Sequence, residues 1–218
     1  MNLEYIQAIL PALLKGTWQT LQVFFLTLVL SLPLGLPFAL GSISRFFPVR
    51  FLSKAYIWVF RGTPLMLQLF FVYYGLPIMF GPAFRMENTV AAVLTFTMNY
   101  AAYFAEIYRA GIESIPVGQY EAAEVLGYSK AQTFVKIILP QVVKRVLPPV
   151  TNETITLVKD TSMAFTISIA EMFTVAKQIG AAQTSVLPLL AAGVFYYIFN
   201  LVVASFMEYL EKKTSYYR

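Results

Sequence analysis

The chain has 218 residues, of which 58% are hydrophobic and 12% are charged, and its mean hydropathy is +0.66. The charged fraction is about half that of an average soluble domain, so the composition excludes a soluble globular protein as well as a disordered one. The sequence contains no Cys and no His, which excludes disulfides, zinc fingers, thiol nucleophiles and catalysis by histidine. In so apolar a chain, the net charge of +5 is explained better by membrane orientation than by binding to nucleic acid.

Five apolar segments are long enough to cross a bilayer, whose core of about 30 Å needs roughly 20 apolar helical residues. In chain order, we predict spans at residues 17–40, 56–80, 90–109, 139–176 and 186–208. Pro33 and Pro37 are expected to kink the first span. The second span is interrupted at residues 61–64 and the fourth near residues 159–162. The sequence therefore predicts an all-α, multi-pass membrane protein whose residues 1–218 form a single domain.

Lys and Arg residues are distributed unevenly between the predicted loops. Twelve of the 16 lie after the first span, after the third span or in the C-terminal tail, and four lie on the opposite side. Because positive residues concentrate on the cytoplasmic side of membrane proteins, this asymmetry places the C-terminus in the cytoplasm and the N-terminus outside.

The predicted cytoplasmic loop between the third and fourth spans contains a short helix. Pro116 suits a helix start, where its missing N–H costs nothing. Residues 119–126 favour helix, and Gly127 is suited to end it in the left-handed conformation. The small side chains of Ala122 and Ala123 allow another surface to approach closely. From residue types alone, a partner-binding helix and an ordinary solvated connector are equally supported.

The same loop contains a motif whose members are Glu121-Ala122-Ala123, Gly127, Ile137, Leu139 and Pro140. It resembles the loop signature of permeases of binding-protein-dependent ABC importers, which is Glu-Ala-Ala, three residues, Gly, nine residues and Ile-x-Leu-Pro. Further segments resemble the polar amino acid branch of that family, which includes histidine, arginine and glutamine permeases. These segments are 14–21, 60–65, 103–112, 114–119 and 159–162.

The resemblance implies a type I importer fold, with five transmembrane helices and a cytoplasmic coupling helix at about residues 117–127, in a prokaryotic cytoplasmic (inner) membrane. Such permeases pair as homodimers or heterodimers, bind a cytoplasmic ABC ATPase dimer and receive solute from an extracytoplasmic binding protein. Glu121, Ala122, Ala123 and Gly127 would belong to the coupling helix, which seats in a groove of the ATPase.

The chain has no phosphate-binding loop of the Gly-x-x-x-x-Gly-Lys-Ser/Thr type. We therefore expect a transport subunit and not an enzyme. It would have no cofactor of its own, because ATP and Mg bind to the partner ATPase. We expect neither a metal site nor a nucleic-acid partner.

Ionisable residues inside a membrane span usually face a cavity or a partner. Glu153 and Asp160 are seven residues apart, about 20° short of two full helical turns. They belong to a predicted polar stripe that suits an ammonium group or a cationic side chain and consists of Asn152, Glu153, Thr156 and Asp160. A second interpretation of Asp160 is an ion pair with Lys159 or a cap on the helix that begins near Thr161.

The third span offers a second stripe. Asn99, Tyr103 and Glu106 are spaced by four and three residues, so they share one helical face. Glu106 is also three residues from Arg109, and an ion pair between these two is the favoured interpretation. Arg61 either extends to lipid headgroups at the inner surface or packs against the solute pathway or the dimer interface. Two residues after the second break are candidate walls of a solute pocket: Met163 and Phe165.

The two carboxylates favour a basic amino acid, namely arginine, lysine or histidine. Lys159 is the only lone cation expected at their depth, which argues against an acidic amino acid. Glutamine is the alternative solute. More remote alternatives are a stand-alone secondary transporter or channel and an intramembrane enzyme. The absence of an internal repeat counts against the first, and the absence of His and Cys counts against the second.

Overall fold

The computed structural model describes residues 3–214, which are almost entirely helical. Arg218, counted in the sequence as a cation of the C-terminal tail, lies outside the described residues. Four short turns of other helix types join the α-helices: η1 (Phe71–Gly75), η2 (Pro82–Phe84), η3 (Phe134–Ile138) and η4 (Thr161–Ile167). The α-helices are α1 (Leu3–Ser42), α2 (Phe47–Gly62), α3 (Leu65–Phe70), α4 (Leu76–Phe80), α5 (Asn88–Glu113), α6 (Val117–Val125), α7 (Lys130–Thr133), α8 (Leu139–Asp160), α9 (Met172–Gln183) and α10 (Leu187–Thr214).

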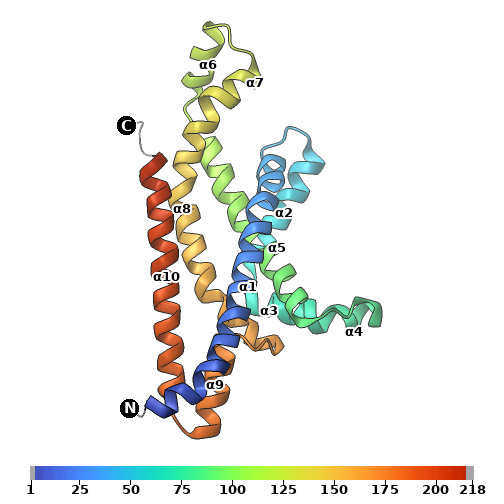
Figure 1. The fold of residues 1–218 in the computed structure, drawn as a ribbon. Coiled ribbons are helices and arrows are strands. Elements are labelled where there is room, and N and C mark those ends of the chain that lie inside the picture. Colours follow the sequence, from blue (N-terminus) through green and yellow to red (C-terminus); the bar gives the residue numbers. More distant parts are fainter. Residues whose placement is uncertain (1–2, 215–218) are drawn as a thin grey trace.

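The long helices run back and forth along one axis (Figure 1). The N-terminal end of the described chain lies at the bottom of the view beside α9, and the C-terminal end lies near the top. Helices α6 and α7 project beyond the other helices at the top. The two ends of the described chain therefore lie at opposite ends of the molecule.

Among residues 3–214, three helices are long and apolar enough to cross a membrane: Gln7–Ser42, Asn88–Glu113 and Leu187–Thr214. A fourth span is possible if Phe47–Gly62 and Leu65–Phe80, which are bent by 105° relative to each other, count as one. The predicted fourth span at 139–176 does not pass the same test, because α8 has charged side chains along its length.

Two helix boundaries differ from the bounds of the predicted spans. Helix α1 begins at Leu3, before the predicted span at 17–40, and it continues through Pro11, Pro33 and Pro37 as one helix. The break in the fourth segment is wider than residues 159–162, since a 3-10 turn and a non-helical stretch separate α8 from α9. Hydropathy averages over many residues, so it locates apolar segments better than the points where helices begin and end.

Small residues allow α1 and α5 to pack closely. Ala101, Ala102 and Ala105 of α5 are fully buried. A Cβ added to Gly35 of α1 would lie 2.9 Å from the Cβ of Phe104 and 3.1 Å from the backbone oxygen of Ala101. Contacts between small residues drive helix association in membranes, where apolar burial alone gives little advantage. The pair α1–α5 is therefore a tightly packed frame.

We expect Gly35→Val to destabilise the protein by about 1–3 kcal/mol, because a side chain at this crossing must push apart two backbones. Gly193→Val is the matched control, since nothing lies within 4 Å of a Cβ built at Gly193 of α10. Thermal unfolding of the purified proteins in detergent measures both effects. Equal losses in the two variants would contradict the importance of the α1–α5 crossing.

The break between α2 and α3 exposes backbone groups at the middle of the bundle, and two side chains satisfy them. The Gln68 side-chain amide donates to the Phe60 carbonyl at 2.9 Å and to the Thr63 hydroxyl at 2.8 Å. The Asn99 amide donates to the same Phe60 carbonyl and to the Gln68 amide oxygen, both at 3.0 Å. Helix breaks at membrane depth persist only where such partners replace the lost bonds. Helix α5 thus fixes the end of α2.

Candidate functional site

Two adjoining cavities lie between the α2–α3 break, α5 and α8. The central cavity has a volume of about 470 Å³, and the α6-side cavity has a volume of about 420 Å³. Arg61, Tyr103 and Glu153 line both. The α6-side cavity extends to Ser114 and Arg145, close to the start of α6. The two cavities together form a hollow, lined by both charged and apolar side chains, that leads from the α2–α3 break toward α6.

The structure brings together five of the eight residues predicted to contact solute. The central cavity is lined by Asn99, Tyr103, Glu153, Thr156 and Asp160. Asn152 is exposed and lines neither cavity. Met163 packs against the hydrophobic core. The ring of Phe165 lies 5.6 Å from that of Phe173, and Lys177 Nζ lies 5.2 Å from the Phe165 ring centre. These last three predicted residues lie outside the cavities.

Asp160 is held by a residue that the sequence analysis did not single out. The Tyr100 hydroxyl donates to Asp160 Oδ2 at 2.8 Å, and Tyr100 is only 2% exposed. The alternative interpretation of Asp160 was wrong, because its side chain makes no capping bond to η4 and forms no ion pair with Lys159 among the described residues. Tyr100 lies three residues before Tyr103, so helical spacing could have placed it on the same stripe.

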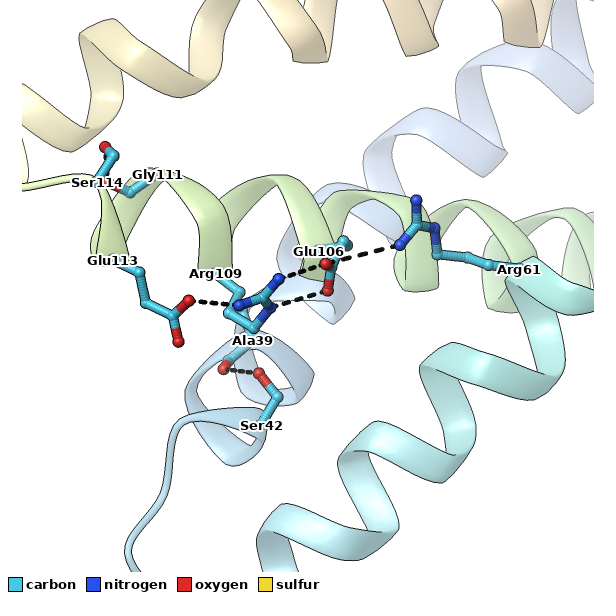
Figure 2. Close-up of polar contacts among 8 residues, drawn as sticks. All are labelled: Ala39, Ser42, Arg61, Glu106, Arg109, Gly111, Glu113 and Ser114. Atoms are coloured by element: carbon cyan, nitrogen blue, oxygen red, sulfur yellow. Dashed lines mark hydrogen bonds and ion pairs between the residues drawn. The ribbon is translucent and has the colours of Figure 1, made fainter.

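Side chains of alternating charge follow one another from Arg61 of α2, through Glu106 and Arg109, to Glu113 at the C-terminal end of α5 (Figure 2). Arg109 donates to both carboxylate oxygens of Glu106 and also pairs with Glu113, so the predicted Glu106–Arg109 ion pair is confirmed. Arg61 Nη1 lies 3.8 Å from Glu106 Oε1, and the Arg61 guanidinium carbon lies 5.2 Å from the centre of the Tyr103 ring.

The side chain of Arg61 is partly exposed and lines both cavities. Of its two interpretations, the structure agrees with packing beside the hollow, and contact with lipid headgroups stays a prediction that the structure does not test. The residue lies at the end of α2, next to the 105° bend. The argument that Lys159 is the only lone cation at this depth was wrong. Lys159 is exposed and lines neither cavity, whereas Arg61 lines both. Because Arg61 is a cation beside these carboxylates, the earlier argument against an acidic amino acid no longer holds.

Glu171, which no sequence pattern indicated, is fully buried and lies outside both cavities. Its carboxylate accepts hydrogen bonds from the backbone N–H groups of Phe173 and Thr174 at 2.7 and 2.6 Å, from the Thr174 hydroxyl at 2.7 Å and from the Tyr196 hydroxyl at 2.8 Å. Glu171 therefore caps the N-terminus of α9 and joins it to α10. The predicted span at 139–176 includes Glu171, so the start of α9 at Met172 was not predicted.

The predicted short helix is confirmed as α6. Gly127 follows it with φ +77°, the left-handed conformation expected of a residue that ends a helix. Glu121, Ala122 and Gly127 are exposed, whereas Ala123 is 1% exposed and packs against the chain itself. Val125 and Leu126 are 87% and 72% exposed. These two form an exposed apolar surface, here called the α6 tip, at the projecting end of the molecule.

Residues 3–214 contain no group of three or more carboxylate side chains close enough together to hold a metal ion. The carboxylates of the hollow instead face a guanidinium and hydroxyl groups.

Comparisons with known proteins agree with this architecture. Residues 31–216 match the family described as binding-protein-dependent transport system inner membrane component. The arginine transport system permease protein ArtQ of Bacillus subtilis is 38% identical over 98% of both chains. The glutamate/aspartate import permease protein GltK of Escherichia coli is 34% identical over 94% of this chain and 95% of its own.

A solved structure extends the likeness to three dimensions. It is the crystal structure of an amino acid ABC transporter with histidines, with a TM-score of 0.88, 29% identity, and coverage of 98% of this chain and 99% of that one. The match to the family model spans most of the sequence. The chain therefore belongs to the family of binding-protein-dependent transport system inner membrane components, and it is a permease subunit and not an enzyme.

Proposed function

We propose that the chain is the permease subunit of an ATP-driven amino acid importer and that the central cavity holds the solute. The observation that carries the proposal is the convergence of Glu153, Asp160 and Arg61 on one cavity of about 470 Å³. Charged groups are costly inside a membrane and usually mark a solute pathway. An α-amino acid presents both an ammonium and a carboxylate group, which these side chains complement. Relatives named as permeases for arginine and for glutamate and aspartate support this class of solute.

A basic amino acid such as arginine, lysine or histidine is the solute that the charge balance favours. Two carboxylates and one guanidinium line the central cavity, so a solute with one net positive charge, as arginine and lysine have and histidine has when its side chain is protonated, neutralises it. Glutamine is the second candidate, because Asn99 and Thr156 also line the cavity and can bond to an uncharged amide.

We further propose five passes through a cytoplasmic (inner) membrane. Helix α8, together with α9, would be the fourth pass. Its polar face borders the hollow, while its buried residues pack against α5 and α10. The α6 end would be cytoplasmic, with the C-terminus on that side and the N-terminus outside. The distribution of Lys and Arg supports this orientation.

The proposed partners follow from the surfaces that the chain exposes. Helix α6, with Glu121, Ala122 and Gly127 exposed, would seat in a cytoplasmic ABC ATPase dimer that binds ATP and Mg. Ala123 would act indirectly, by packing α6 against the chain. A second permease subunit and an extracytoplasmic binding protein would complete the transporter.

Binding of labelled arginine to the reconstituted permease–ATPase complex tests the proposal. Glu153→Gln and Asp160→Asn are each expected to weaken binding by about tenfold or more, since a charge-assisted hydrogen bond contributes about 1.5–3 kcal/mol. Both changes preserve side-chain size, so the complex should still assemble. Glu208→Gln, an exposed position on α10, is the control and should bind normally. Arginine binding that is unaffected by both cavity variants would contradict the proposed site.

A further inference from the structure

The two arginines beside Glu106 differ in what their guanidinium groups do. Arg109 donates hydrogen bonds to Glu106 and Glu113. Arg61 makes no hydrogen bond to any described residue through its guanidinium, and its only ion pair is the 3.8 Å contact to Glu106. Arg109 already donates to both oxygens of Glu106, and Arg61 makes no bidentate pair there. Its donors remain available.

Those donors face the hollow in which an amino acid would sit. The Arg61 side chain is 39% exposed and lines both cavities, together with Glu153. A guanidinium is planar and presents parallel N–H groups that match the two oxygens of a carboxylate. The Arg61 guanidinium lies over the ring of Tyr103. This cation–π contact stabilises the positive charge and leaves the N–H groups of Arg61 free to donate hydrogen bonds.

The backbone that bears Arg61 is fixed before any solute arrives. Its neighbour Phe60 has a carbonyl that accepts hydrogen bonds from both Gln68 and Asn99. The cation therefore projects from a held position at the end of α2, and only its side chain has to move. A group ordered in this way loses less entropy when it binds a ligand.

On the basis of the function proposed above, we infer that Arg61 is the receptor for the carboxylate group of the solute. Its guanidinium exchanges the long contact with Glu106 for a bidentate pair with the solute carboxylate. The ammonium or cationic end of the solute then lies toward Glu153 and Asp160. Glu106 stays neutralised by Arg109 during the exchange, so no carboxylate is left without a partner.

A pair of ligands isolates this contact. Agmatine is arginine without its carboxylate, so the ratio of arginine affinity to agmatine affinity measures what the carboxylate contributes. In the reconstituted permease–ATPase complex, the native protein should bind arginine at least about tenfold more tightly than agmatine. In Arg61→Gln the ratio should fall to about one, with agmatine binding retained. Lys159→Gln, which removes the exposed cation outside the cavities, should keep the native ratio.

The outcomes separate this inference from the function on which it rests. A native ratio retained in Arg61→Gln overturns the role of Arg61, as does a ratio lost in Lys159→Gln instead. If Arg61→Gln does not assemble, Arg61→Lys replaces it, and an undiminished ratio in that variant overturns the role because lysine lacks the planar pair of donors. A native complex that binds neither arginine nor agmatine nor any other amino acid overturns the proposed site itself.

Discussion

Replacing Leu126 with arginine at the α6 tip is expected to abolish the stimulation of ATP hydrolysis by loaded binding protein. Leu126 is 72% exposed beside Val125, which is 87% exposed, so the tip presents apolar side chains. Helix α6 projects beyond the other helices (Figure 1). If this surface is seated in an ATPase groove, an arginine there loses its water without gaining a partner, at a cost of several kcal/mol. Stimulated hydrolysis in proteoliposomes should fall by about tenfold or more.

Leu126→Met is the matched control for the same site. It keeps an apolar side chain of similar volume, so the stimulation should be close to native. Thermal unfolding of the isolated permease should be unchanged in both variants, because an exposed side chain contributes little to folding. Full stimulation in Leu126→Arg would show that the ATPase does not contact the α6 tip.

The second large effect is expected at Glu171. Glu171→Leu should lower the free energy of unfolding by about 3–5 kcal/mol, because it leaves buried donors without an acceptor and removes the cap of α9. The Tyr196 hydroxyl and two backbone N–H groups all lose their partner. Unfolding in detergent, followed by loss of helical signal, measures the change.

Glu171→Gln separates the hydrogen bonds from the charge. Glutamine keeps one acceptor oxygen, so its loss of stability should lie between those of the native protein and Glu171→Leu. Glu208→Leu is the control, since it changes a carboxylate on the exposed surface of α10, and no measurable shift is expected there. A Glu171→Leu protein as stable as the native one would contradict the structural role of this cap.

Helical periodicity predicted the parts of the fold that depend on neighbouring residues. The shared face of Asn99 and Tyr103, the stripe of Glu153 and Asp160 and the left-handed Gly127 all depend on short spacings, and the structure contains them. Arg61 lines the cavities at the end of α2, next to a 105° bend. Such an angle is set by tertiary contacts, and a hydropathy profile has no signal for it.

Contacts between distant helices account for the rest. The bond from Tyr100 to Asp160 joins residues 60 positions apart, and the bond from Tyr196 to Glu171 joins α10 to the start of α9. Helix α8 does not qualify as a membrane span by hydropathy, because the charged residues of its polar face lower the average over the helix. That average does not show that its other face is apolar and packs against neighbouring helices. Which face of α8 is buried becomes known only from the three-dimensional structure.

The division between frame and cavity has an evolutionary consequence. Among the described residues, those that line the two cavities come from the α2–α3 region, α5 with its C-terminal boundary, and α8, and none comes from α1 or α10. Replacing a few side chains that line the cavities would therefore change the charge of the site, while α1 and α10, which supply none of the lining, could keep their packing. Relatives named for cationic arginine and for anionic glutamate and aspartate, at 38% and 34% identity, are the diversity that such an arrangement permits.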